Sequence, residues 1–217
     1  WLVRGLRAGE TLLALGPVVR NSLFASGMAA LVTVLAALPV AVLVVRRPSR
    51  FSQMLERLCY AAFALPGIAV ALALVFFGIN YARPLYQTFV MLLLAYAILF
   101  LPQAVGALRT SLLQIHPSVE EAARSLGRTP LQVFGSITLP LMRPGLLAGA
   151  SLVFLTTMKE LPATLILAPI GFKTLAVDVW SSVSEAFFAR AAAPALVIVL
   201  LSSVPLALMT IREQRES

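Results

Sequence analysis

The chain has 217 residues and a formal net charge of +8, and 60% of its residues are hydrophobic whereas only 12% are charged. Soluble domains average roughly 25% charged residues, so this composition excludes an ordinary water-soluble domain and favours a membrane protein. The positive charge does not indicate nucleic-acid binding, because the Arg residues lie between apolar runs and not in a patch with interleaved aromatic side chains. The single cysteine, Cys59, excludes a disulfide within the chain.

The apolar residues fall into runs that follow one another along the chain, and a membrane-spanning helix needs roughly 20 such residues. These runs predict an all-α, polytopic membrane protein with about five transmembrane helices whose outer faces contact lipid. The expected spans are residues 23–45, 58–82, 84–108, 144–168 and 191–211. We expect Asn21 and Ser22 to cap the first helix, and Pro66-Gly67 to break the second one gently.

The connections between these spans differ in charge. Arg residues are concentrated in the first connection, the third connection and the tail, at positions 46, 47, 50, 57, 109, 124, 128, 143, 212 and 215. The basic residues of the second and fourth connections are Arg83, Lys173 and Arg190. Cytoplasmic loops carry an excess of Arg and Lys, so the first set predicts the cytoplasmic side. Arg4, Arg7 and Arg20 then fall on the outer side, against this rule, and the conflict is smaller if upstream helices of a longer chain already fix the orientation.

We divide the chain into three parts. Residues 1–20 are expected to be an outer segment that continues from an upstream half, residues 21–211 the transmembrane domain, and residues 212–217 a cytoplasmic tail. Because the sequence opens at Trp1 and not at an initiator Met, we expect it to be a piece of a longer protein.

The third connection is the most informative stretch. Ser118, followed three residues later by Glu121, has the pattern of a capping box and predicts a helix that begins there. Gly127 supplies a stop, so the helix has about two turns. Its apolar stripe consists of Val119, Ala122, Ala123 and Leu126. Thr129-Pro130 then predicts a second short helix with Pro at its first position.

A helix this short is marginal in water, and its apolar stripe needs a surface to pack against. The residues alone leave two alternatives open. The connection folds back onto the ends of its own membrane helices, or it docks onto a partner. Glu120 and Arg124, four residues apart, are expected to form a local surface pair that contributes roughly a few tenths of a kcal/mol.

A resemblance favours docking. The motif resembles the EAA loop of binding-protein-dependent ABC importer permeases, with each consensus position at its expected spacing. Its residues are Glu121, Ala122, Ala123, Gly127, Ile137, Leu139 and Pro140. The position of the loop, between the third and fourth of five helices, is also similar to the MetI-like core of that family. We refer to residues 117–140 as the EAA loop.

The resemblance implies that the EAA loop forms coupling helices that sit in a cleft of an ATP-binding subunit. Glu121 would accept charge-assisted hydrogen bonds from that subunit, and Gly127 would let the chain reverse. Ala122 and Ala123 would make the close contact. The family also implies an ATPase dimer in the cytoplasm, a periplasmic substrate-binding protein and a location in the bacterial inner membrane. This sequence has no P-loop motif, so we expect no cofactor here and ATP on the partner.

The fourth expected span contains charged residues. The sequence Lys-Glu-Leu-Pro-Ala-Thr places Lys159, Glu160, Pro162 and Thr164 inside an otherwise apolar run. A charge at mid-bilayer costs roughly 2.5–3.5 kcal/mol on insertion scales, so it usually faces the bundle interior or an aqueous path. Neighbours on a helix do not face each other, so Lys159 and Glu160 are expected to have separate partners. Two roles stay open: pairing with an adjacent helix or subunit, and lining or gating the translocation pathway.

The stretch from Lys159 to Trp180 is similar to the iron(III) branch of these permeases, in which one long chain carries two such halves. The chain would then be the C-terminal half, acting with the N-terminal half of the same permease or with a second permease copy. Iron(III) is a hard ion that prefers oxygen ligands, and Glu160 is the best oxygen ligand expected in the membrane. Permeases for thiamine, polyamines or phosphonates share the scaffold and stay open as alternatives.

Two function classes other than transport would require different sequence features. An intramembrane enzyme would need a metal-ligand set, or a nucleophile with a base, at membrane depth. The sequence has no H-E-x-x-H motif, and its one histidine, His116, lies in the third connection and not in a span. A non-transporting scaffold would not need the spacing of the EAA loop. We therefore expect a transporter subunit with no catalytic residue.

Overall fold

The computed structural model describes the backbone of residues 15–216 and the side chains of residues 15–203. The predicted outer segment is thus described only from residue 15, and no side chain of the predicted tail is described. Within these residues the regular elements are all helices. In chain order they are α2 (Gly16–Arg46), α3 (Arg50–Ala61), η2 (Ala62–Ala64), α4 (Gly67–Tyr81), η3 (Arg83–Leu85), α5 (Phe89–Leu113), α6 (Pro117–Ser125), α7 (Pro130–Val133), the π-helical η4 (Phe134–Thr138), α8 (Leu139–Leu141), α9 (Arg143–Met158), α10 (Pro162–Leu167), α11 (Leu175–Ser184) and α12 (Phe188–Glu216).

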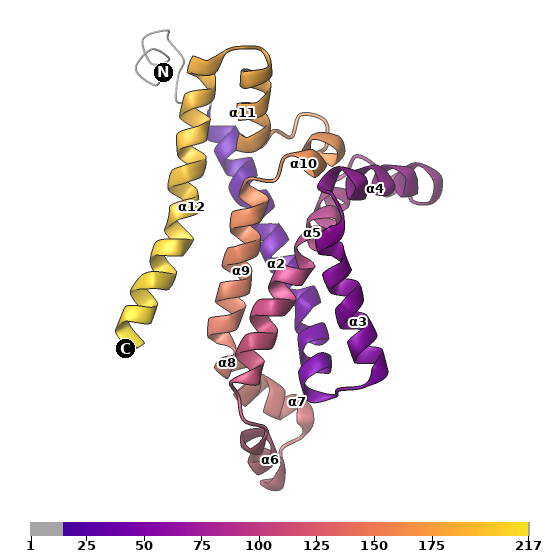
Figure 1. Ribbon diagram of the computed structural model, residues 1–217, viewed down its shortest axis with the longest axis vertical. Helices are drawn as coiled ribbons and strands as arrows, with labels where there is room; N and C mark the ends of the chain where they lie inside the picture. Colours follow the sequence, from indigo (N-terminus) through magenta and orange to yellow (C-terminus); the bar gives the residue numbers. More distant parts are fainter. Residues whose placement is uncertain (1–14, 217) are drawn as a thin grey trace.

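The long helices form a bundle. In it α2, α5 and α9 pack side by side, and α12 runs along α9 (Figure 1). The short helices α6, α7 and α8 lie at one end of this bundle, and α4, α10 and α11 lie at the other (Figure 1). We call these the α6 end and the α11 end. The EAA loop therefore forms one end of the molecule.

By length and composition, α2 and α5 are each able to cross a bilayer. Two further pairs of helices are long and apolar enough to cross a bilayer if each pair is taken as one span. Both pairs are bent: α3 with α4 by 108°, and the α7–α8 segment with α9 by 66°. The last helix, α12, is 29 residues long, and it is apolar over residues 188–203, the part whose side chains the structure describes. These elements follow the order of the predicted spans, so the predicted all-α polytopic fold is confirmed.

The first helix begins earlier than predicted. Pro17 occupies one of the first two positions of α2, where its fixed φ suits a helix start. Asn21 and Ser22 therefore lie inside the helix, and the prediction that they cap it is wrong. The Ser22 hydroxyl instead accepts a hydrogen bond from the Leu175 N–H at 2.7 Å, and the Asn21 side chain donates to the Lys173 carbonyl at 3.1 Å. These bonds join α2 to the start of α11.

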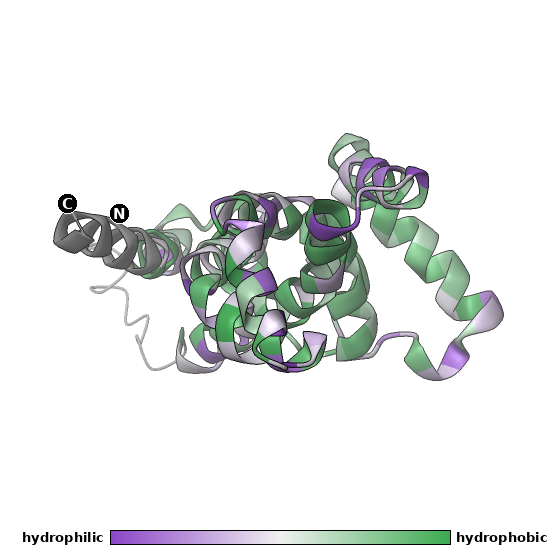
Figure 2. Ribbon diagram, turned by 90° about the horizontal axis from the view of Figure 1, so that it is seen from below, coloured by the Kyte–Doolittle hydropathy of each residue, from purple (hydrophilic) through white to green (hydrophobic). Residues whose placement is uncertain are grey.

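The second predicted span is broken sharply and not gently. Leu65 and Pro66 have extended backbone, with ψ of 124° and 140°. A residue before Pro is pushed out of the helical region, and Pro has no N–H for a helical bond. As a result, α4 stands away from the bundle and is hydrophobic over most of its length (Figure 2). Its side chains Leu72, Phe76 and Phe77 are exposed in the single chain.

The boundaries of the third and fourth predicted spans also change. α5 begins at Phe89 and not at residue 84, because Arg83–Leu85 forms a separate 3-10 turn. α9 stops at Met158, and α10 begins at Pro162, so the fourth predicted span, over 144–168, consists of two helices with a break just before Pro162. Pro is tolerated at the first position of a helix because the N–H that it lacks has no helical partner there.

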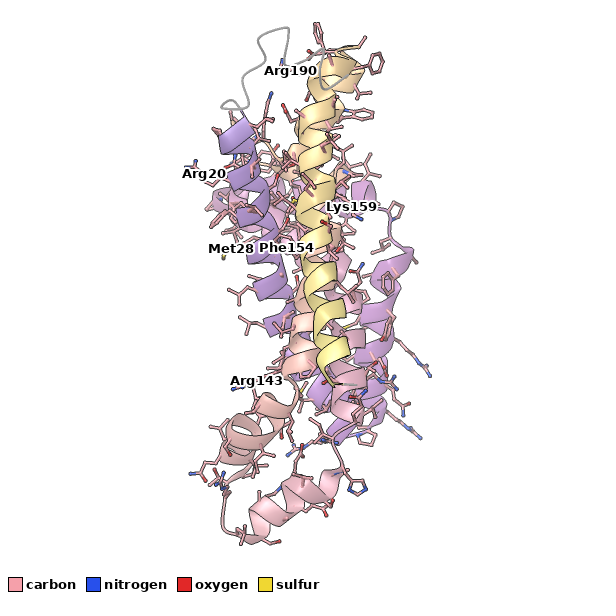
Figure 3. The ribbon with its side chains drawn as sticks, turned by 90° about the vertical axis from the view of Figure 1, so that its left-hand side faces the viewer. Arg20, Met28, Arg143, Phe154, Lys159 and Arg190 are labelled. Atoms are coloured by element: carbon pink, nitrogen blue, oxygen red, sulfur yellow. The ribbon has the colours of Figure 1, made fainter. Side chains whose placement is uncertain are left out.

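Lys159 and Glu160 consequently lie at a break between two helices. The 16 residues of α9 rise about 24 Å at 1.5 Å per residue, which approaches the thickness of a bilayer core. Along the bundle, Lys159 lies closer to the level of Arg20 than to that of Arg143 (Figure 3). The charged residues are therefore near the α11 end of the bundle and not midway along a span.

Small residues allow the central helices to approach closely. On α2, the fully buried residues include Ala29, Ala37 and Ala41. On α9, Gly145 and Gly149 face α5: a methyl group at Gly145 would overlap Ser111, and one at Gly149 would lie 3.6 Å from the Ala104 Cα. In a bilayer the hydrophobic effect does not drive helices together, so this short-range contact contributes much of the packing energy.

Gly145→Val is expected to destabilise the bundle by about 1–3 kcal/mol, because the added side chain overpacks the contact between α5 and α9. Thermal unfolding of the purified chain in detergent should show a lower midpoint. Gly27→Val is the matched control, because Gly27 is exposed on α2 and a side chain there would meet open space. Equal midpoints for the two variants would contradict the close approach of α5 and α9.

Candidate functional site

The first short helix of the EAA loop begins before Ser118, the predicted start. α6 starts at Pro117, and His116 caps it: the His116 Nδ1 accepts a hydrogen bond from the Ser118 N–H at 3.3 Å. The predicted start at Ser118 with a capping box to Glu121 is therefore wrong, because Pro117 already fits the first helical position. The predicted stop is confirmed, since Gly127 follows the helix with a φ of +84°, which favours glycine.

The second short helix is confirmed. Thr129 and Gln132 form a capping box, in which the Thr129 N–H donates to Gln132 Oε1 at 2.9 Å, and α7 begins at Pro130. The chain then continues through η4, which carries Ile137, and through α8, which carries Leu139 and Pro140. These three consensus residues are half-buried and lie where the EAA loop bends into α9.

The two faces of α6 have different surroundings. Glu120 and Ala123 are each only 6% exposed. The exposed face comprises Val119, Glu121, Ala122 and Leu126. The predicted apolar stripe is therefore split, because Ala123 belongs to the buried face whereas Ala122 remains accessible. Neighbouring residues on a helix point about 100° apart, which is why Glu120 and Glu121 have opposite environments.

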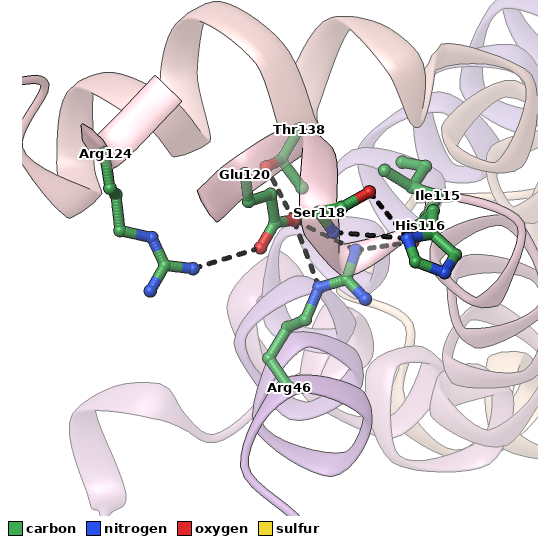
Figure 4. Close-up of polar contacts among 7 residues, drawn as sticks. All are labelled: Arg46, Ile115, His116, Ser118, Glu120, Arg124 and Thr138. Carbon is green, nitrogen blue, oxygen red and sulfur yellow. Dashed lines mark hydrogen bonds and ion pairs between the residues drawn. The ribbon is translucent and has the colours of Figure 1, made fainter. Parts of the chain in front are cut away.

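Glu120 is the centre of a buried hydrogen-bond network (Figure 4). Its Oε1 lies 3.1 Å from Arg46 Nε and 2.9 Å from Arg46 Nη2, and it accepts a hydrogen bond from the Thr138 hydroxyl at 3.0 Å. Arg46 is the last residue of α2 and also donates to the Ile115 carbonyl at 3.0 Å. The expected pair with Arg124 is present at 3.6 Å, but the Arg124 side chain is 52% exposed.

The prediction that Glu120 is a surface residue with a local partner is therefore wrong in its main point. The side chains of Arg46 and Glu120 are 16% and 8% exposed, and removal of one member of such a pair typically costs about 3–5 kcal/mol. Sequence analysis missed the pair because 74 residues separate its members. The available signals were an Arg at the end of an apolar span and a second carboxylate beside Glu121.

A second polar cluster surrounds the break between α9 and α10. The Glu160 carboxylate accepts hydrogen bonds from the N–H groups of Ala163 and Thr164, both at 3.0 Å, and from the Thr164 hydroxyl at 2.8 Å. The Tyr96 hydroxyl on α5 lies 2.7 Å from Thr164 Oγ1. Glu160 thus accepts hydrogen bonds from amides at the start of α10 that have no partner inside the helix.

The same carboxylate lies beside the first residue of α4. A Cβ at Gly67 would be 3.2 Å from Glu160 Oε1, and α10 packs against α4. A negative charge is favoured near a helix N-terminus, where the macrodipole is positive. Of the other predicted pathway residues, Thr164 belongs to this cluster and Pro162 starts α10. Lys159 is exposed and makes no hydrogen bond or ion pair with the side chains that the structure describes.

The described residues contain no group of three or more His, Cys, Asp and Glu side chains placed to hold a metal ion. Hydrogen bonds from α10 already occupy three of the roughly four acceptor positions on the Glu160 carboxylate.

Comparison with known proteins agrees with this arrangement. The family described as "Binding-protein-dependent transport system inner membrane component" matches residues 29–217. The Fe(3+)-transport system permease protein FbpB 2 of Haemophilus influenzae is 45% identical over 189 residues, which are 87% of this chain and 37% of that protein. The sulfate transport system permease protein CysT of Salmonella typhimurium is 33% identical over 169 residues, 73% of this chain and 61% of that protein. The chain spans less than two thirds of either relative.

Solved structures share the fold at low sequence identity. An amino acid ABC transporter with histidines gives a TM-score of 0.69 at 18% identity, covering 99% of this chain and 98% of that one. The inward-facing MetNI methionine ABC transporter gives 0.66 at 18% identity, covering 94% and 96%. All of these proteins are transporters and not enzymes. The match over residues 29–217 shows that the chain belongs to the family of inner membrane components of binding-protein-dependent transport systems.

Proposed function

We propose that the chain is a membrane-spanning permease subunit of an ABC importer in the bacterial inner membrane, and that its solute is iron(III) delivered by a periplasmic binding protein. The family match and the 45% identity to an Fe(3+)-transport permease support this proposal. A partner ATPase dimer supplies the energy, since this sequence has no P-loop for phosphate binding. A second permease half, fused or separate, completes the pathway.

The observation that carries the proposal is the exposed face of α6. Leu126 is 85% exposed and Val119 43% exposed, and Leu131 on the adjacent α7 is 80% exposed. Apolar side chains clustered at a polar end of a membrane protein are unfavourable unless another subunit covers them. Glu121 lies on the same face, has no ion-pair partner among the described residues, and presents a carboxylate for charge-assisted hydrogen bonds.

The mechanism that we propose is alternating access. ATP binding closes the ATPase dimer and displaces the coupling helices that are seated on it. The EAA loop continues through η4 and α8 into α9, so the displacement reaches a spanning helix along the chain itself. The bundle opens outward, receives solute from the docked binding protein, and returns to the inward-facing state after hydrolysis.

The choice of solute rests on degree of similarity. Relatives named as permeases for sulfate, 2-aminoethylphosphonate and molybdate or tungstate are 33%, 28% and 25% identical, against 45% for the Fe(3+)-transport relative. Iron(III) is therefore the solute that we favour, and an oxyanion is the second candidate. Thiamine and polyamines are further alternatives on the same scaffold.

For the translocation pathway we propose that Glu160 holds two broken helices together. Its carboxylate accepts hydrogen bonds from the start of α10 and lies beside Gly67, the first residue of α4, and the Thr164 hydroxyl lies within hydrogen-bond distance of Tyr96 on α5. Pro162 sets the start of α10, and Lys159 adds an exposed positive charge beside the break. Direct contact between iron(III) and Glu160 then requires α10 to release the carboxylate, because both of its oxygens already accept hydrogen bonds.

Glu121→Lys is expected to leave an inserted, folded chain that binds its ATPase roughly ten- to a hundredfold less well, because a charge-assisted hydrogen bond contributes about 1.5–3 kcal/mol. Co-purification of the ATPase with the tagged permease measures this. Glu185→Lys is the control, because Glu185 is exposed at the α11 end. Normal ATPase recovery with the Glu121 variant would remove the docking assignment.

Reconstitution in proteoliposomes, with the ATPase and the binding protein, tests the solute. We expect ATP-dependent accumulation of iron(III) and no accumulation of sulfate or 2-aminoethylphosphonate. Omission of the binding protein should abolish uptake. Uptake of an oxyanion in place of iron(III) would reverse the solute assignment and leave the permease assignment intact.

Glu160→Ala is expected to lower the free energy of unfolding by about 1–3 kcal/mol, because it leaves two amides of α10 without a partner. Lys159→Ala is the control and should change it by less than about 0.5 kcal/mol. Thermal unfolding in detergent compares the stability of the two variants with that of the wild type. Glu160→Gln separates structure from contact with the ion: unchanged iron(III) uptake at normal expression would exclude direct ligation by Glu160.

A further inference from the structure

We propose that the Arg46–Glu120 pair is a joint that makes α2 move together with α6, so that the ATPase drives the first spanning helix as well as α9. The proposal rests on the function proposed above, because it takes α6 as the helix that the ATPase grips. It assigns a positioning role to Arg46 and Glu120, which lie on the side of α6 opposite the exposed docking face.

The chain itself does not connect α6 to α2. α6 follows α5 and leads through α7, η4 and α8 into α9, whereas α2 leads into α3. Within the described part of the chain, the side-chain hydrogen bonds that join α6 to α2 come from Arg46. If this contact were absent, a displacement of α6 would reach α2 only indirectly, through the packing of α5 and α9.

The geometry of the Arg46–Glu120 contact allows a displacement of α6 to be transmitted to α2. The Arg46 guanidinium is a planar fork that holds Glu120 on α6 and the Ile115 carbonyl just before α6 at the same time. Thr138, on η4, donates to the same oxygen of Glu120. Three segments that are distant in sequence therefore meet at one carboxylate. Because the pair is largely buried, separating it would expose or strand a charge, and the segments are expected to move as a unit.

The far end of α2 is also fastened by hydrogen bonds. The Ser22 hydroxyl accepts a hydrogen bond from the N–H of Leu175, the first residue of α11, and the Asn21 side chain donates to the carbonyl of Lys173 just before it. α2 is one continuous helix from Gly16 to Arg46, and from Ser22 to Arg46 it rises about 36 Å. A displacement of α6 can thus reach the α11 end through a single helix that is bonded at both ends.

The test uses the complete permease reconstituted with its ATPase and binding protein, and compares Arg46→Gln, Glu120→Gln and the double variant. The amount of ATPase recovered and its basal ATP hydrolysis, each expressed per folded permease, should stay at the wild-type level. The number of solute ions transported per ATP hydrolysed should fall about tenfold. The solute used is iron(III), or sulfate if the wild-type permease transports sulfate. The double variant should be no worse than the poorer single variant, because both changes break the same contact.

Two further variants separate coupling from folding. Arg47→Gln is the matched control, because Arg47 is adjacent but exposed, and it should transport normally. Arg46→Lys keeps the charge and loses the fork, so its transport per ATP should lie between the wild type and Arg46→Gln.

The proposal is overturned if both single Gln variants transport normally per ATP, or if Arg47→Gln causes the same loss. It is also overturned if transport falls only in step with loss of the ATPase, which would mean that the pair merely folds the docking helix. A wild-type chain that recovers no ATPase would instead refute the proposed function.

Discussion

In the core of a bilayer there is no water for backbone N–H and C=O groups, so each break in a spanning helix must be completed by protein atoms. This constraint explains the placement of the polar side chains. Glu160 accepts from two amides at the start of α10, and the Ser22 hydroxyl accepts from the amide of Leu175 at the start of α11. The chain can interrupt its helices at the α11 end because these side chains replace the missing backbone partners.

Between its two ends the bundle depends on a different interaction. Gly145 and Gly149 on α9, together with the buried alanines of α2, allow the central helices to pack closely. The polar contacts are concentrated near the ends, where Arg46 meets Glu120 and where Ser22 meets Leu175. A closely packed middle with directional bonds at both ends is the construction expected of helices that shift together, as the proposed alternating-access mechanism requires.

The EAA loop shows which structural features local sequence patterns can predict and which they cannot. The stop at Gly127 and the second helix at Thr129-Pro130 follow from glycine and capping signals and are present, whereas the first helix is present with His116 as its cap and not the predicted Ser118. The division of α6 into two faces was not predicted. Glu120 and Glu121 are the same residue type at adjacent positions, and only the position of Arg46, at the end of another helix, determines which of them is buried.

The sequence by itself determined the membrane class, the order of the spans and the spacing of the EAA motif, because hydropathy and helix signals are properties of neighbouring residues. The tertiary structure alone decided the 108° bend between α3 and α4, the Arg46–Glu120 pair and the position of Glu160 between α4 and α10. The two pairings join residues that are far apart in the chain, and the angle at a break is set by how the flanking helices pack. No local pattern encodes such contacts, since they exist only once the helices are brought together.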